Sequence, residues 1–337
     1  MKQYLLPKDG SFYKANLHCH STVSDGLWTP EQIKANYMEQ GYSVVAYTDH
    51  DIMVSHHELT DGSFLALTGY EMEINEPKDP KNPRKHKTCH LCYISLSKDE
   101  PPQVCWHREK YTHIGNAKNY VADAKFDASL PDYEREYSHE CINDMIKKGR
   151  EGGFFVTYNH PVWSLENYEN YIGYEGMNAM EICNFGCVAA GYPDYNPMVY
   201  DDILRSGKRI FCIAADDNHN HIEDSFGGFT VIKAEKLDYE TVTNALKNGD
   251  FYASQGPEIK ELWVEDGKVH ITCSPAAEIY FTTGVRKAEK VTAKGGESLT
   301  EAEFKILPEY NYIRLTVVDH TGKPANTNAY FTDTIEL

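Results

Sequence analysis

The sequence predicts an α/β fold followed by a small all-β region, and three observations indicate this arrangement. From Phe12 to about Ser254, short apolar runs alternate with amphipathic stretches. Such alternation is typical of a parallel sheet, either open or closed into a barrel. Histidines and carboxylates gather at the ends of the apolar runs. After Gln255-Gly256-Pro257 the pattern changes to alternating apolar and polar residues, which is typical of half-buried strands.

The apolar runs are short and rich in β-branched and aromatic residues, as strands are. An extended run begins near Phe12, and the later strands are expected at 43–47, 64–68, 90–96, 154–158, 179–183, 210–214 and 229–232.

The clearest predicted helix lies between the first two strands. Thr29 is a favourable N-cap, Pro30 suits the first helical position, and Gln32 completes a capping box. Gly41 marks the end of this helix.

Two further helices are expected over 141–148 and 239–246, the second between Asp238 as N-cap and Gly249. The polar segment 78–87 predicts a surface loop. The segment 101–130 is compatible with an inserted helical segment near the mouth of the site.

The tail predicts a small all-β domain over 258–337, sandwich-like, behind a first domain over 1–257. Val269, Ile271 and Cys273 alternate with polar neighbours, and the pair Asp266-Gly267 before them predicts a hairpin turn. Further strands are expected at 279–283, 312–318 and 329–335.

The composition narrows the classes of function. A formal net charge of −18 disfavours a nucleic-acid surface, which needs clustered Lys and Arg. No apolar stretch has the length of a membrane span, and the first residues lack the apolar core of a signal peptide. The 9 cysteines are expected to be reduced thiols of a cytoplasmic protein, and the pair Cys89 and Cys92 are expected to be core thiols of a strand. The oligomeric state is left open.

Most of the 15 histidines lie at or before His221, which leaves only His270 and His320 in the tail. His18 and His20 end the first extended run. Residues two apart on a strand point to the same side, so both imidazoles can meet one metal ion. A lone His-x-His is equally compatible with two surface histidines.

Later strand ends add more groups that can bind a metal. They are Thr48-Asp49-His50-Asp51, Gly69-Tyr70-Glu71, His90, Asn159-His160-Pro161 and Asp216-Asp217-Asn218-His219, while Asp25 follows His20 around a turn. Barrel enzymes place their sites at one end of successive strands. Each residue alone could cap a helix or lie on the surface, but their recurrence at strand ends favours a metal site.

These motifs resemble the signature of the PHP (polymerase and histidinol phosphatase) domain across roughly residues 12–255. The tail resembles, more loosely, the β-domain of carbaryl-hydrolase-like PHP proteins. The resemblance implies a distorted seven-stranded β/α barrel that binds up to three divalent metals, Zn, Mn or Fe. It implies a first metal on His18, His20, Glu71 and Asp217, a second shared by Glu71 with His90 and His160, and a third on Asp25, His50 and His219. Glu71, Asp217 and Asp25 would be the catalytic carboxylates.

This constellation predicts a metal-dependent hydrolase, with a phosphoester as the expected small-molecule substrate. The same metals could cleave amides, carbamates or carboxylic esters, or the domain could bind metal without turnover. A cation near the strand ends would favour phosphate, and Arg135, Lys87 and Arg84 are the candidates. Asp49, Asp51 and Asp216 could orient ligand imidazoles or cap helices. Trp28 and Trp163 could line an aromatic pocket or simply pack.

Overall fold

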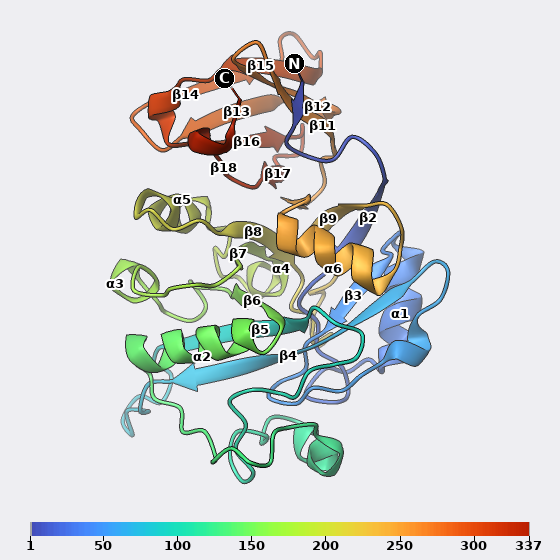
Figure 1. Cartoon of the computed structure of the whole chain (residues 1–337), viewed down its shortest axis with the longest axis vertical. Coiled ribbons are helices and arrows are strands. Elements are labelled where there is room, and N and C mark those ends of the chain that lie inside the picture. The colour runs from blue at the N-terminus through green and yellow to red at the C-terminus, as the bar shows by residue number, and fades with distance from the viewer. Residues whose placement is uncertain (1, 337) are drawn as a thin grey trace.

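The computed structural model describes residues 2–336, and its main feature is a 14-stranded mixed sheet (Figure 1). The strands that precede the tail are β2 (Ser11–Asn16), β3 (Val44–Tyr47), β4 (Leu65–Asn75), β5 (Thr88–Ser95), β6 (Phe154–Tyr158), β7 (Ala179–Asn184), β8 (Phe211–Ala215), β9 (Phe229–Ala234) and β10 (Phe251–Ser254).

The sheet is not parallel throughout, so this part of the sequence prediction was wrong. Strands β2, β3 and β4 are parallel, as are β6, β7 and β8, but β5 is antiparallel to both β4 and β6. The reason is the connection between β4 and β5, an exposed loop without a helix, whereas parallel neighbours need a long crossover.

Strands β2 to β8 follow one another in chain order, and the segment after β8 returns to β2 through a parallel bridge of Cys19 and Asn218. However, β9 pairs antiparallel with the other part of β2, and β10 with β9, so the sheet continues past β2. The structure therefore has a mixed α/β architecture, while the seven-stranded barrel stays a prediction.

Strand β4 is longer than predicted and reaches Asn75, because β5 pairs with its second half. Glu71 thus lies within a strand and not beyond its end. Glu71 and Glu73 share one face of β4 because side chains alternate along a strand. His90 is the direct partner of Glu73 on β5, so the three side chains reach the same side of the sheet.

The helices are short and connect the strands. They are α1 (Pro30–Glu39), α2 (His139–Glu151), α3 (Tyr168–Tyr171), α4 (Phe185–Ala189), α5 (Pro197–Arg205) and α6 (Tyr239–Asn248), with the 3-10 turns η1 (His57–Leu59), η2 (Ala117–Asp123), η3 (Pro308–Tyr310) and η4 (Thr332–Thr334). The predicted capping box of Thr29 and Gln32 on α1 is confirmed. Asp238 caps α6, which ends at Gly249 with φ +79°. Among residues 2–336, no helix combines the length and apolar character needed to cross a membrane.

The segment between β5 and α2 lies at the end of the molecule opposite the tail (Figure 1). A helical insertion was predicted here, but η2 is the helical part of this segment in the described chain. Trp106 and Ala117 pack instead on Val23 and Ile52 in a small separate cluster. Gly115, at φ +53°, lets the segment approach the loop of Asp25, since a Cβ atom there would lie 2.0 Å from the carbonyl oxygen of Ser24.

The tail is all-β, as predicted. Its strands are β11 (Ile259–Glu265), β12 (Lys268–Ala276), β13 (Glu278–Thr283), β14 (Ala288–Thr292), β15 (Leu299–Lys305), β16 (Tyr312–Val318), β17 (Pro324–Thr327) and β18 (Tyr330–Phe331), and β1 (Gln3–Tyr4) joins them by pairing with β11. Asp266 and Gly267 form the predicted turn between β11 and β12. The prediction of a strand over 329–335 is wrong after Phe331, because β18 ends there and the chain forms the 3-10 turn η4.

Two sheets of the tail pack face to face through one apolar cluster. Leu262 and Ile271 belong to a 4-stranded sheet of β1, β11, β12 and β15, whereas Phe281 and Leu315 belong to the large sheet. The large sheet extends into the tail because β17 pairs with β10.

A buried ion pair also links the tail to α5. The guanidinium of Arg314 on β16 donates from Nε and Nη2 to the carboxylate of Asp201, over 2.8 and 2.7 Å.

Candidate metal centre

The structure brings the predicted ligand residues into one largely buried cluster, to which β4 and β5 contribute from within the strands and the other segments from beyond strand ends. Three groups of side chains each offer ligand atoms within 4.8 Å of one another. Their members are His18, His20, Glu71 and Asp217; His20, Asp25, His50 and His219; and His50, Glu71 and His90. The ninth predicted residue, His160, lies beside them.

The first group coincides with the set predicted for the first metal. His18 Nε2 and His20 Nε2 lie 3.1 Å apart, which agrees with the expectation that a His-x-His pair turns both rings to one side. Glu71 Oε1 is 3.2 Å from His18 Nε2, and Asp217 Oδ1 is 3.0 Å from His20 Nε2. These atoms could share one divalent ion.

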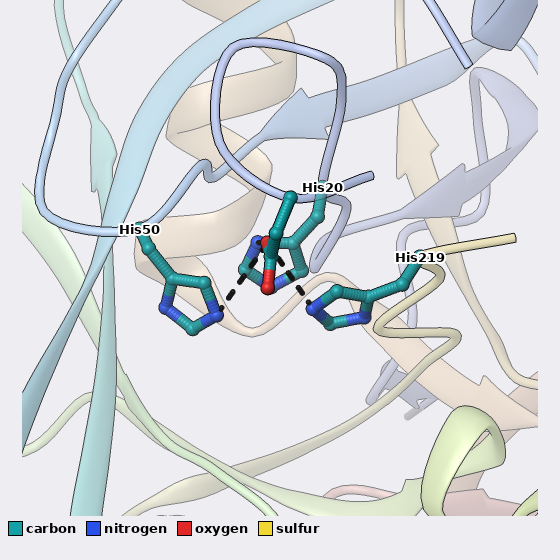
Figure 2. A group of neighbouring side chains, drawn as sticks. His20, His50 and His219 are labelled. Carbon is teal, nitrogen blue, oxygen red and sulfur yellow. Dashed lines mark ion pairs between the residues drawn. The ribbon is translucent and has the colours of Figure 1, made fainter. Parts of the chain in front are cut away.

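The second group gathers around the carboxylate of Asp25, where the imidazoles of His20, His50 and His219 converge (Figure 2). Asp25 Oδ1 lies 3.5 Å from His219 Nε2 and 3.9 Å from His50 Nε2. This group contains the three residues predicted for the third metal, with His20 in addition.

Glu71 connects the first group to the third. Its Oε1 lies 3.2 Å from His90 Nδ1 and 3.3 Å from His160 Nε2, while its Oε2 lies 3.3 Å from His50 Nδ1. The family resemblance predicted that His160, and not His50, binds the second metal together with Glu71 and His90. Both imidazoles are within reach of Glu71, so the division of ligands among the metals stays a prediction.

Several atoms of these side chains are buried and have no hydrogen-bond partner within residues 2–336. They are Asp25 Oδ1, His50 Nδ1, both ring nitrogens of His90, and Asp217 Oδ1. Buried lone pairs without a partner are costly, and divalent cations bind imidazole nitrogen and carboxylate oxygen. The residues present therefore fit bound divalent metals.

The electrostatics favour the ligating form of two members of the cluster, His50 and Asp217. Burial, followed by the proximity of His20, lowers the pKa of His50 to about 3, so its imidazole is neutral and can offer a lone pair at neutral pH. Burial opposes the ionisation of Asp217, but the neighbouring imidazoles of His18 and His20 outweigh it and hold the pKa of Asp217 below its ordinary value.

The backbone is strained at two of these residues. His160 has a backbone φ of 27° and Asp217 one of 53°. Residues other than glycine rarely adopt such positive φ values. Such strain is concentrated at functional sites, where the surrounding structure holds it in place. Asp217 N donates to His18 O over 2.9 Å, which contributes to holding Asp217 against the segment that follows β2.

Sequence reasoning missed Glu181 on β7, which is fully buried beneath the cluster. Its Oε1 lies 2.7 Å from His18 Nδ1, and its Oε2 accepts from the backbone N–H of His160 over 3.0 Å. A carboxylate on the far nitrogen orients a ligand imidazole. The sequence does give one indication of this role, because Glu181 is the single acidic residue in the apolar run 179–183.

Asp49, Asp51 and Asp216 were predicted to orient imidazoles or to cap helices. Instead, two of them accept hydrogen bonds from backbone N–H groups of loops, and the third forms an ion pair. Asp49 accepts from the backbone N–H groups of Ser21 and Ser24, which fixes the loop that carries Asp25. Asp51 pairs with Arg135. Asp216 accepts from the backbone N–H groups of residues 226, 227 and 228.

A pocket of about 390 Å³ opens over the cluster, which is enough for a small molecule. Trp163 forms part of its wall, with its ring 5.3 Å from that of His90 and 5.0 Å from that of His160. Trp28 packs against Phe226 away from this pocket.

The three candidate phosphate-binding cations do not line the pocket. Arg135 is buried against Asp51, Lys87 donates to Asn170, and Arg84 lies in the exposed loop between β4 and β5.

Comparison with known proteins gives a short sequence match. No family model matches the chain. A 5'-3' exoribonuclease of Haemophilus influenzae is 35% identical over 66 residues. This match covers 18% of the chain and 24% of the exoribonuclease, so the chain spans about a quarter of the length of this curated relative.

Solved structures match over longer stretches at low identity. A two-domain protein from Bacteroides vulgatus, described as containing a predicted PHP-like metal-dependent phosphoesterase, has a TM-score of 0.45 and 15% identity, over 99% of this chain and 91% of that one. A candidate metal-dependent phosphoesterase from Bifidobacterium adolescentis has a TM-score of 0.39 and 19% identity, over 72% and 98%. An amidohydrolase from Chromobacterium violaceum has a TM-score of 0.39 and 15% identity, over 62% and 91%. The chain is similar to PHP-like phosphoesterases and to an amidohydrolase.

Proposed function

We propose that this protein is a metal-dependent hydrolase and that it cleaves phosphoesters. The observation that carries the proposal is the sharing of Glu71, His20 and His50 among three groups of potential ligands. Shared ligands are what a multinuclear centre requires, and such centres serve phosphoester hydrolysis. The PHP-like motifs of the sequence support the same function.

In this proposal His18, His20, Asp25, His50, Glu71, His90, His160, Asp217 and His219 hold up to three divalent ions, Zn, Mn or Fe. When bound, such ions polarise the substrate oxygen and activate water. Glu71 would contribute to two of the sites, since it belongs to two of the ligand groups. Glu181 keeps the ring of His18 in place, and Trp163 keeps water away from one side of the pocket. Activity is expected to fall in acid, where ligand side chains are protonated.

A second candidate is the hydrolysis of amides, carbamates or carboxylic esters. One observation favours it: among residues 2–336, no lysine or arginine lines the pocket, so the protein offers no cation of its own for a phosphate group. A third candidate, metal binding without turnover, needs the same ligands but no substrate.

The domain boundary belongs to this proposal too. We assign residues 1–257 to the metal-binding domain and 258–337 to the all-β domain, with Met1 and Leu337 outside the described residues. A small-molecule substrate and a cytoplasmic location complete the proposal.

The test is hydrolysis by protein reconstituted with Mn²⁺ or Zn²⁺, against phosphomonoesters, phosphodiesters, aryl carbamates and aryl esters. His160→Ala is the variant, and His320→Ala in the tail is the matched control. Phosphoester turnover that His160→Ala abolishes and His320→Ala retains would support the proposal. Turnover of carbamates or esters alone would replace it with the second candidate. Full metal occupancy without any turnover would favour the third.

A further inference from the structure

The pocket over the metal centre is divided by the chemistry of its lining. The histidines and carboxylates of the cluster form its floor. The rest of the lining contains the apolar side chains of Ile114, Trp163, Cys187, Ala190 and Ile222, together with the polar side chains of His221 and Asp224. The pocket thus offers an apolar surface to the part of a substrate that does not react.

The carboxylate of Glu73 also lines the pocket. Its Oε2 lies 3.8 Å from His90 Nε2, and its Oε1 lies 3.8 Å from His113 Nε2, both too far for hydrogen bonds. No cationic side chain of lysine or arginine accompanies Glu73 in the pocket of the described chain. The nearby Arg135 is held by Asp51 and by the backbone carbonyl of Glu73.

The lining therefore favours a phosphate group at the metal ligands and disfavours a second phosphate elsewhere in the pocket. The ions that the floor would hold attract one phosphate group. A second phosphate on the same molecule would meet the carboxylates of Glu73 and Asp224 and apolar side chains, where no lysine or arginine of residues 2–336 compensates its charge. An uncompensated charge is unfavourable in apolar surroundings, and the repulsion between a carboxylate and a second phosphate weakens the binding of a ligand that carries one.

We infer that the substrate is a small phosphoester of an uncharged, apolar or aromatic alcohol, and that molecules with a second phosphate, including nucleoside bisphosphates and oligonucleotides, are poor ligands. This inference rests on the proposed function and adds the substrate class. Trp163 and Ile222 contact the alcohol part, and Glu73 acts against additional anionic groups. The pocket volume of about 390 Å³ agrees with a ligand of one ring and one phosphate.

The test measures binding and needs no turnover. Phenylphosphonate and benzene-1,4-diphosphonate are compared by calorimetry on the Mn²⁺-loaded full chain, because they share one ring and differ by one anionic group. We expect phenylphosphonate to bind about tenfold more tightly or better. Equal or tighter binding of the diphosphonate would overturn the inference and leave the phosphoesterase proposal intact.

Two variants test the lining itself. Ile222 is 49% exposed, so Ile222→Lys adds a cation to the wall without disturbing a core. Glu73→Gln removes the carboxylate at constant size. Each is expected to reduce the preference for phenylphosphonate by several-fold, whereas Val291→Lys, on β14 in the tail, should leave it unchanged. If both lining variants keep the wild-type preference, the lining does not set it and the inference fails. If neither phosphonate binds and no phosphoester is hydrolysed, the proposed function fails together with it.

Discussion

The guanidinium of Arg135 lies 2.6 Å from the carboxylate of Asp51, the residue that directly follows the predicted ligand His50. Both side chains are buried, at 4% and 1% exposure. Arg135 also donates to the carbonyl oxygen of Glu73 on β4 and lies over the ring of Tyr111. The buried guanidinium of Arg135 therefore links the segment between β5 and α2 to β4 and to the loop after His50, which carry part of the metal centre.

Arg135→Met should destabilise the protein at pH 8 by about 3 kcal/mol, because it leaves the buried carboxylate of Asp51 without its partner. Burial, opposed by Arg135, raises the pKa of Asp51 to about 6, so the variant should lose less stability at pH 5, where Asp51 can accept a proton. Urea unfolding at both pH values measures this. Arg84→Met, in the exposed loop, is the control, and equal stability of the two variants would contradict the role of the pair.

Glu181→Gln should weaken metal binding by 10- to 100-fold while the fold is kept, because an amide is a poorer partner for His18 than a carboxylate. Calorimetric titration with Zn²⁺ and circular dichroism of the metal-free protein provide the two readouts. Glu175→Gln, whose side chain is 65% exposed, is the control. Unchanged affinity in Glu181→Gln would show that His18 does not need this carboxylate.

Glu166 gives a prediction for the effect of pH on stability. Its carboxylate accepts hydrogen bonds from the hydroxyls of Tyr137, Tyr158 and Tyr174 in a buried pocket. Burial raises the pKa of Glu166 above its ordinary value of 4.5, although the tyrosine hydroxyls act in the opposite direction. The folded state therefore binds a proton more readily than the unfolded state.

The contribution of Glu166 to stability is fully present below pH 4.5 and is lost as the pH rises through the raised folded pKa. Metal-free wild type should thus lose stability relative to Glu166→Gln between pH 4.5 and pH 8, as measured by urea unfolding. Glu289→Gln on the surface should show no such difference. A gain of wild-type stability over Glu166→Gln across this range would mean that the tyrosines dominate and lower the pKa.

Asp201→Asn should cost about 3 kcal/mol of folding free energy, because it leaves the guanidinium of Arg314 buried without its counter-charge. Thermal and urea unfolding measure this loss. The neighbouring variant Asp202→Asn should cost at most about 1 kcal/mol, since Asp202 pairs with the half-exposed Arg205. Similar losses in both variants would argue against a special role for the pair of Asp201 and Arg314.

Features encoded by neighbouring residues could be predicted from the sequence. The capping box of Thr29 and the turn of Asp266 and Gly267 depend on contacts within a few residues, and both were predicted correctly. Most of the predicted ligands could be located because they follow an apolar run, whereas His90 opens one and Asp25 follows a turn. Their ligand roles stay predictions, although the structure brings them together.

Features that depend on distant partners could not be predicted. The length of β4 depends on its pairing with β5, and the antiparallel direction of β5 depends on the loop between them. Glu181 acts on His18 across 163 positions of sequence, and no local pattern reveals that pairing. The segment between β5 and α2 is fixed by Arg135 and Gly115, and not by the periodicity of a helix.

The pairing of β17 with β10 has a consequence for how the protein is made. Strand β10 acquires its second neighbour from residues 324–327, which are made well after β10 itself, and β1 must wait for β11 to be synthesised before it can pair. During translation, the sheet that carries the metal centre therefore keeps an unprotected edge at β10 until β17 has been synthesised. Unpaired edges invite association between chains, so nascent chains that stall before residue 324 should depend on chaperones.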